Sequence, residues 1–191
     1  MFPCTNLKHL EAADYSMADK HFSPSELNEA LEGAIPSIWR FAIALTRNKA
    51  DADDLTQATC LRVLEKRQQF VAGSHFKAWC KQICRSVWLN QLRAARVRKT
   101  QDIDSVSEDA LASISPNSEL NIFASEVFRE IMNLPEAQRE TVFLVYAEGY
   151  RYSEAAKILE VPIGTIMSRL SAARQKLKWL ESDNPVQMGK R

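Results

Sequence analysis

The sequence predicts an all-α protein made of two small helical domains that a flexible acidic linker joins. Apolar residues recur at helical spacing in several separate stretches of the chain. Glycine and proline, which interrupt helices, number only 5 and 7 among 191 residues. The sequence contains no β-hairpin signal, internal repeat or low-complexity tract. A chain of this length accommodates two small domains, and its 46% of hydrophobic residues can form a core in each.

Three helices are expected in the first domain, residues 23–99, which follows a flexible extension at residues 1–22. The first helix begins where Ser23 caps it, Pro24 takes the first helical position and Glu26 lies in the opening turn. Its apolar residues keep helical spacing: Leu27, Leu31, Ile35, Ile38, Ala42 and Leu45.

A second helix is expected over residues 49–69, after a break at Arg47 and Asn48. Leu55 and Leu61 are expected to form its inward face. Three acidic residues lie in its first turns, where the positive end of the helix dipole favours them: Asp51, Asp53 and Asp54.

The third helix begins at Phe76, after a turn at Gly73 and Ser74, and carries a strongly cationic surface. Residues 73–100 include seven basic residues and no acidic one. Trp79 is expected in the core. Helical spacing separates an apolar face (Phe76, Cys80, Ile83, Val87) from a cationic stripe with one aromatic residue (Lys77, Lys81, Arg85, Trp88).

Residues 100–118 have no helical period and are expected to form the linker. Residues 101–126 include six acidic residues and no basic one, whereas residues 149–191 include eight basic and four acidic residues. Two cationic blocks around an acidic spacer favour two separate contacts with a polyanion, which the spacer itself avoids. Solvated helix faces and a solvated loop explain the same charges and stay an open alternative.

The second domain is expected at residues 119–181, followed by a tail at 182–191. Its last two helices, with a tight turn between them, have the DNA-binding helix-turn-helix arrangement. The helices and their boundaries are read from these residues: Ile122, Val127, Ile131 and Leu134 in the first; Pro135, Glu136, Val142, Val145, Tyr146 and the terminal Gly149 in the next; Glu154 to Leu159 in a short helix; Glu160 to Pro162 in the turn; and Ile166, Leu170, Ala173 and Leu177 inward in the last.

Several other classes of protein fit the sequence poorly. No apolar run approaches the roughly 18 residues of a membrane span, and the N-terminus lacks a signal-peptide apolar region, so a cytoplasmic location is expected. Cys80 and Cys84 lie one turn apart after His75, but no fourth ligand is evident and core packing is favoured over a metal or redox role. Together with Cys4 and Cys60 they are expected to be thiols. No catalytic triad or phosphate loop is found, so no cofactor is expected.

Two ordered groups of motifs resemble the extracytoplasmic-function (ECF) sigma factors, group IV of the sigma-70 superfamily. Residues 149–156 (GYRYSEAA) and 158–170 (ILEVPIGTIMSRL) resemble region 4, as do LP at 134–135, QRE at 138–140 and AR at 173–174. In the first domain, RFA at 40–42, LT at 45–46, DADDL at 51–55 with Gln57, and LR at 61–62 resemble region 2.1 to 2.2, and FKAW at 76–79 with Ile83 resembles region 2.3.

The resemblance implies a transcription initiation factor, not an enzyme, that acts as a dissociable subunit of core RNA polymerase. Such factors recognise −10 and −35 promoter elements, help to melt the DNA, and are commonly held inactive by an anti-sigma factor that is often anchored in the membrane. Residues 23–99 would then be the region 2 domain and residues 119–181 the region 4 domain.

The resemblance also implies three sets of site residues. The set for core polymerase is Asp51, Asp53, Asp54, Leu55, Gln57 and Arg62. The set for −10 DNA is Phe70, Ser74, His75, Phe76, Lys77, Lys81, Arg85, Ser86, Trp88, Asn90, Arg93, Arg96 and Arg98. The set for −35 DNA is Arg151, Tyr152, Thr165, Ser168, Arg169, Ser171, Arg174 and Lys176.

Some positions depart from the family pattern. Met167 and Ala172 replace side chains that are often basic and base-reading, and Glu160 replaces a usual glycine, at a cost of about 1 kcal/mol if it is left-handed. Ala58, Ser86 and Asn90 replace a usual Glu, Asn and Asp. A sigma-like decoy that sequesters an anti-sigma factor and a plain helix-turn-helix regulator remain alternatives.

Overall fold

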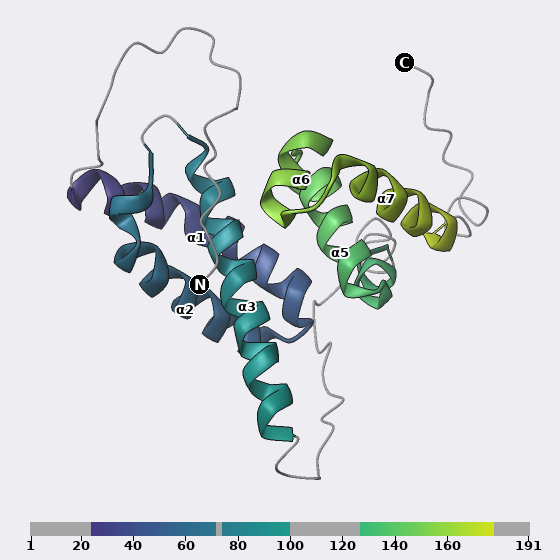
Figure 1. Cartoon of the computed structure of the whole chain (residues 1–191), viewed down its shortest axis with the longest axis horizontal. Helices are drawn as coiled ribbons and strands as arrows, with labels where there is room; N and C mark the ends of the chain where they lie inside the picture. The colour runs from purple at the N-terminus through teal and green to yellow at the C-terminus, as the bar shows by residue number, and fades with distance from the viewer. Residues whose placement is uncertain (1–23, 72–73, 100–126, 178–191) are drawn as a thin grey trace, which may run out of the picture. The chain divides into compact units, whose positions relative to one another are not determined.

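The computed structural model describes residues 24–71, 74–99 and 127–177. These ranges are helical and contain no strand, which confirms the predicted all-α class (Figure 1). The predicted extension, the linker and the tail, at residues 1–22, 100–118 and 182–191, lie outside the described residues.

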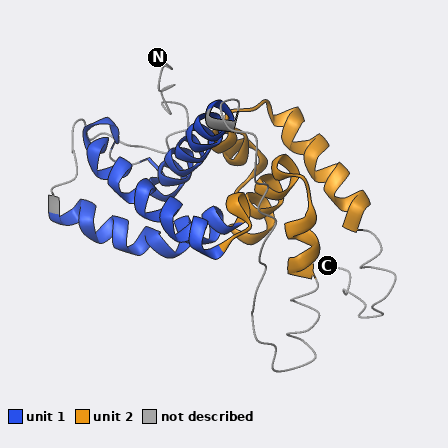
Figure 2. Cartoon of the chain, turned by 90° about the horizontal axis from the view of Figure 1, so that it is seen from below, with its two compact units in different colours: residues 1–43, 49–107 blue, residues 44–48, 108–191 orange. Residues whose placement is uncertain are grey.

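The chain divides into two compact units, coloured separately in Figure 2. Unit 1 comprises residues 1–43 and 49–107, and unit 2 comprises residues 44–48 and 108–191. The helices of unit 1 are α1 (Pro24–Thr46, whose last residues are assigned to unit 2), α2 (Lys49–Glu65), the short 3-10 helix η1 (Arg67–Gln69) and α3 (Phe76–Lys99).

Helix α1 begins at Pro24, as its local sequence predicts, and packs its apolar face inward. Ala34, Ile38 and Phe41 are fully buried. Ile35, expected on the same face, is 40% exposed, because it lies at the edge of the buried stripe, about 100° around the helix from Ala34. The prediction of an inward Ile35 is therefore wrong.

Helix α2 packs against α3 and ends at Glu65, four residues before the expected end at Gln69. Leu55 and Val63 are buried on its inward face. Leu61 is 64% exposed, so the prediction that it faces inward is wrong. It lies nine residues beyond the buried Ala52, which places it about 180° around the helix from that residue.

Unit 2 is built from short helices. Residues 127–133 are helical, and the structure continues with α5 (Glu136–Val142), the π-helix η2 (Phe143–Ala147), α6 (Tyr152–Leu159) and α7 (Ile163–Leu177). The chain leaves η2 through Gly149, whose φ of +74° suits glycine at this predicted helix end. The buried guanidinium of Arg139 donates to the carbonyl oxygens of Met132 and Leu134, at 3.3 and 2.7 Å, and fastens the turn before α5.

Helix α7 packs against both α5 and α6. It buries Ile166, Leu170 and Ala173, as its periodicity predicts. The turn from α6 into α7 passes through Glu160, whose φ of 52° and ψ of 46° are left-handed. Helix, tight turn and helix therefore follow one another as the sequence predicts, with the strained residue at the expected position.

Candidate nucleic-acid interface

The surface of α7 opposite its buried stripe is uncharged near the N-terminus of the helix and cationic near its C-terminus. Ile163, Gly164, Met167, Ser168 and Ser171 are exposed in the first half. In the second half, Arg174, Gln175 and Lys176 are exposed. Four of these residues belong to the predicted −35 set: Ser168, Ser171, Arg174 and Lys176.

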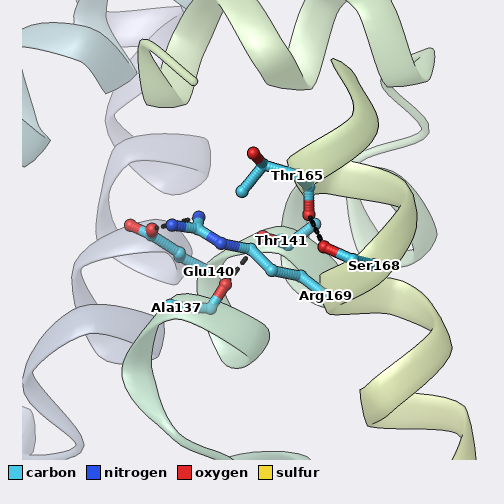
Figure 3. Close-up of polar contacts among 6 residues, drawn as sticks. All are labelled: Ala137, Glu140, Thr141, Thr165, Ser168 and Arg169. Carbon is cyan, nitrogen blue, oxygen red and sulfur yellow. Dashed lines mark hydrogen bonds and ion pairs between the residues drawn. The ribbon is translucent and has the colours of Figure 1, made fainter. Parts of the chain in front are cut away.

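Arg169 is not part of this open surface, because its guanidinium points back to α5 (Figure 3). Its Nη1 donates to Glu140 Oε1 at 3.1 Å, and the two side chains are only 20% and 3% exposed. A carboxylate buried this deeply needs its cation, since an unpaired buried charge is strongly unfavourable. The predicted base contact of Arg169 is at odds with this pairing, which joins α7 to α5.

The polar side chains beside Arg169 bond within their own helices. Ser168 Oγ donates to the carbonyl oxygen of Thr165 at 3.0 Å, and Thr141 Oγ1 donates to that of Ala137 at 2.7 Å (Figure 3). Thr165 is half-buried, whereas Ser168 is exposed. Of the two predicted contacts, Ser168 therefore has the more open position.

Helix α6 begins next to the same surface. The backbone N–H of Arg151 donates to Glu154 Oε2 at 2.8 Å, so the acidic side chain caps the first turn. This cap explains why α6 begins at Tyr152, two residues before the expected start. Arg151 is exposed and Tyr152 is half-buried, so the arginine side chain is open to a phosphate.

In unit 1, the C-terminal half of α3 presents a polar face. Ser86, Asn90 and Arg93 are exposed at helical spacing, and Arg93 Nη1 donates to Asn90 Oδ1 at 3.0 Å. Lys77 and Arg96 are exposed as well. The other members of the predicted −10 set on α3 are Arg85 and Trp88, both half-buried, and Arg98, in the last turn.

Lys81 is a correction to the predicted cationic stripe. It is fully buried, and its Nζ donates to the buried hydroxyl of Ser37 on α1. The preceding Cys80 and the following Ile83 and Cys84 are buried too, so Lys81 lies on the core-facing side of α3. A lysine in this position holds α3 against α1 and does not contact phosphate.

The loop that precedes α3 is anchored by an aromatic cluster. The ring of Phe70 lies 5.2 Å from that of Phe76 and 5.1 Å from that of Trp79, measured between centroids. Phe70 is buried, so its predicted contact with DNA is at odds with its position, where it packs against the rings of Phe76 and Trp79 at the start of α3. Ser74 Oγ donates to the carbonyl oxygen of Val71 at 2.7 Å, and His75 is exposed.

Helix α2 presents the acidic residues predicted to bind polymerase. Asp51, Asp54 and Gln57 are exposed, and so is Arg62, which forms a surface ion pair of 2.6 Å with Glu65. The half-buried Asp53 accepts a hydrogen bond of 2.6 Å from Trp39 Nε1. Leu55 is fully buried in the core, so its predicted place on the polymerase-binding surface is wrong.

Sequence reasoning missed two open side chains. Leu61, an exposed apolar residue, lies on the outward side of α2, and Gln175 lies on the outward side of α7. The spacing of Leu55 and Val63 was sufficient to place Leu61 outside the buried stripe. Gln175 carries no charge and therefore escapes a search based on charge.

The described cysteines Cys60, Cys80 and Cys84 are free thiols. Burial raises the pKa of Cys80 and the pKa of Cys84 to about 12, so both stay protonated at neutral pH. Within the described ranges, no group of three or more His, Cys, Asp or Glu side chains is arranged to hold a metal ion. The same ranges contain no helix with the length and apolar character needed to span a bilayer.

Comparison with known families identifies both halves of the chain. The family model for Sigma-70 region 2 matches residues 32–98, and the model for Sigma-70, region 4 matches residues 125–177. The ECF RNA polymerase sigma factor EcfG of Rhodopseudomonas palustris is 37% identical over 154 residues, which cover 81% of this chain and 84% of the relative. The ECF sigma factor SigC of Mycobacterium tuberculosis is 33% identical, covering 73% and 75%.

Solved structures of sigma factors have a similar fold. The sigma factor RpoE of Bartonella quintana, in complex with the anti-sigma factor NepR, has a TM-score of 0.70 and 33% identity, covering 83% of this chain and 98% of that one. CnrH, in complex with the cytosolic domain of CnrY, has a TM-score of 0.59 at 19% identity, covering 85% and 91%, and supports the fold alone.

Proposed function

The chain belongs to the family of ECF RNA polymerase sigma factors, and on this premise we propose how its two units share promoter recognition. Unit 1 binds core RNA polymerase and the −10 element, and unit 2 binds the −35 element through α7. The helix-turn-helix carries this proposal, because α7 packs on α5 and α6 with one face and leaves the opposite face open. The protein acts in the cytoplasm as a dissociable polymerase subunit and not as an enzyme.

In unit 2, exposed cations at the edge of the DNA-facing surface orient α7 on the DNA, and smaller side chains contact the bases. Arg174 and Lys176 near the end of α7, with Arg151 at the start of α6, contact phosphates on the two sides of the groove. Ser168 and Ser171 lie closer to the base edges, because the N-terminal half of a recognition helix enters the groove. This division of roles is supported by their exposure.

In unit 1, the exposed face of α3 meets the −10 element. Flipping a base out of the duplex costs a few kcal/mol, which phosphate neutralisation and stacking offset. Ser86, Asn90 and Arg93 offer hydrogen-bonding groups on one face, and Lys77 and Arg96 are exposed cations on the same helix. The aromatic cluster of Phe70, Phe76 and Trp79 holds the start of α3 next to Ser74 and His75, the described residues proposed to meet the flipped base.

The outward side of α2 binds core polymerase. Asp51, Asp54, Gln57 and Arg62 are exposed on the same helix as the exposed Leu61, and an apolar centre with polar residues outside it is the usual composition of a protein interface. Leu61 takes the apolar role that sequence reading gave to Leu55.

An anti-sigma factor regulates this chain in the same proposal. The similar RpoE of Bartonella quintana was solved in complex with the anti-sigma factor NepR. Exposed apolar side chains support such a partner, since Leu61 on α2 is 64% and Tyr146 on η2 is 57% exposed. An anti-sigma factor that covers Leu61 competes directly with polymerase, whether that factor is free or membrane-anchored.

Reconstitution tests the proposal. The purified protein is mixed with sigma-free core polymerase and genomic DNA, and the transcript start sites are mapped. We expect specific starts, their loss with Leu61→Asp, and normal starts with Ile35→Asp, a control at another exposed apolar side chain. If the protein binds core polymerase but yields no transcripts, a decoy is favoured. If it binds DNA but neither binds core polymerase nor yields transcripts, a plain helix-turn-helix regulator is favoured.

A further inference from the structure

The first half of α7 has no open side chain that can recognise one base by two hydrogen bonds. Between Ile163 and Ala172 the sequence contains no Lys, His, Asn or Gln, and Arg169 is its only cation. Arg169 is engaged by the buried carboxylate of Glu140. The side chains that distinguish guanine or adenine by two hydrogen bonds are therefore missing from the part of the helix nearest the bases.

What this half of α7 offers instead is an apolar ridge. Ile163 and Met167, one turn apart, are 45% and 50% exposed, and Ser171 continues the same side of the helix. Ser168 lies next to this ridge, with its hydroxyl hydrogen donated to the carbonyl oxygen of Thr165. A Cβ added at Gly164 would meet no atom of the described residues within 4 Å apart from its chain neighbours and its own helix backbone, so those residues leave the space beside the ridge open.

The major groove contains one apolar group that differs between bases, the C5-methyl of thymine. Methionine is unbranched and polarisable, so it can follow an irregular surface and pack on a methyl group. We infer that Met167 is a specificity-determining residue, whose side chain packs against one or two thymine methyl groups of the −35 element. This inference rests on the proposed function, since it requires α7 to lie in the major groove.

Deoxyuridine provides a direct test, because it differs from thymidine only by the missing methyl group. The probes are duplexes with the −35 element of a mapped promoter, in which each thymine is replaced singly, and the measured quantity is their affinity for the reconstituted holoenzyme. Burying one methyl group supports a change of about fourfold. We expect a loss of that size at one or two positions with the wild-type chain.

Matched variants assign the effect to Met167. Met167→Ala should bind thymine and uracil duplexes equally at those positions, whereas Met167→Leu, which keeps an apolar side chain, should retain the preference. Ile163→Ala and Arg174→Ala should retain it too, although Arg174→Ala should weaken every duplex. These residues are exposed, so the variants should fold.

An unchanged preference in Met167→Ala, or a wild-type chain indifferent to every replacement, overturns the inference while transcription from the promoter continues. Failure of the proposed function would be seen differently, as the absence of specific transcripts from every thymine-containing template. The two failures are therefore distinguishable in one set of reconstitutions.

Discussion

In each unit, one cation that the sequence placed among the DNA contacts is engaged within the protein, fully buried at Lys81 and 20% exposed at Arg169, and the two differ in partner and in consequence. In unit 1, Lys81 donates to the neutral hydroxyl of Ser37, and other cations of α3 stay exposed. In unit 2, Arg169 pairs with the carboxylate of Glu140, and the first half of α7 is left without an open cation. Unit 1 thus keeps an electrostatic surface, whereas unit 2 must read its half of the promoter mainly with uncharged groups.

The largest effect should come from breaking the ion pair of unit 2. Arg169→Ala removes the cation that pairs with the deeply buried carboxylate of Glu140, and we expect a loss of about 3 kcal/mol in the free energy of unfolding, measured by denaturant titration. Arg174→Ala, at an exposed position of the same helix, is the control and should leave stability within about 0.5 kcal/mol.

A double variant of the same ion pair distinguishes a purely structural role of Arg169 from direct recognition of a base. If Arg169 only holds α7 in place, the double variant Glu140→Met with Arg169→Met removes both charges and should regain stability and −35 binding together. Stability regained without −35 binding would instead assign Arg169 a direct contact with DNA.

The corresponding test in unit 1 is Lys81→Ala. Removing a fully buried side chain leaves a cavity, and we expect a loss of about 2 kcal/mol in unfolding free energy with no change in the salt dependence of promoter binding. The exposed Lys77 should behave in the opposite way. Lys77→Ala should leave stability unchanged and lower the slope of log affinity against log salt by about 1. Equal slopes for the two variants would contradict the assignment.

A substitution at Gly164 separates an effect on the stability of unit 2 from an effect on its binding to DNA. A helical glycine costs roughly 0.5 to 1 kcal/mol relative to alanine, and no protein atom occupies the space of the missing Cβ. Gly164→Ala should therefore raise the melting temperature. If α7 approaches DNA closely at this position, the same variant should weaken −35 binding. Improved stability with unchanged affinity for the −35 duplex would show that the DNA does not reach Gly164.

Local features of the fold were predictable from sequence, whereas the partners of buried charges were not. Pro24 at a helix start and Gly149 at a helix end act through their own backbone, and the structure has them where expected. Lys81 and Arg169 find their partners 44 and 29 residues away, so helical periodicity alone cannot tell them from solvated cations. The exposed positions of Ser86, Ser168 and Arg174 follow from periodicity, because no other described residue buries them.

The smallest effect should come from the turn that directs α7. Glu160 is left-handed, which costs about 1 kcal/mol for a residue with a Cβ, whereas glycine adopts this conformation freely but loses more entropy on folding. The two terms nearly cancel, so Glu160→Gly should raise the unfolding free energy by only about 0.5 kcal/mol. Arg47→Gly is the matched variant, since Arg47 has a φ of 62° at the break between α1 and α2. Similar small gains at both positions, read from thermal melts, would mean that the turn stores strain but contributes nothing specific to DNA binding. A loss of −35 affinity in Glu160→Gly alone would instead mean that the strained residue fixes the angle at which α7 enters the groove.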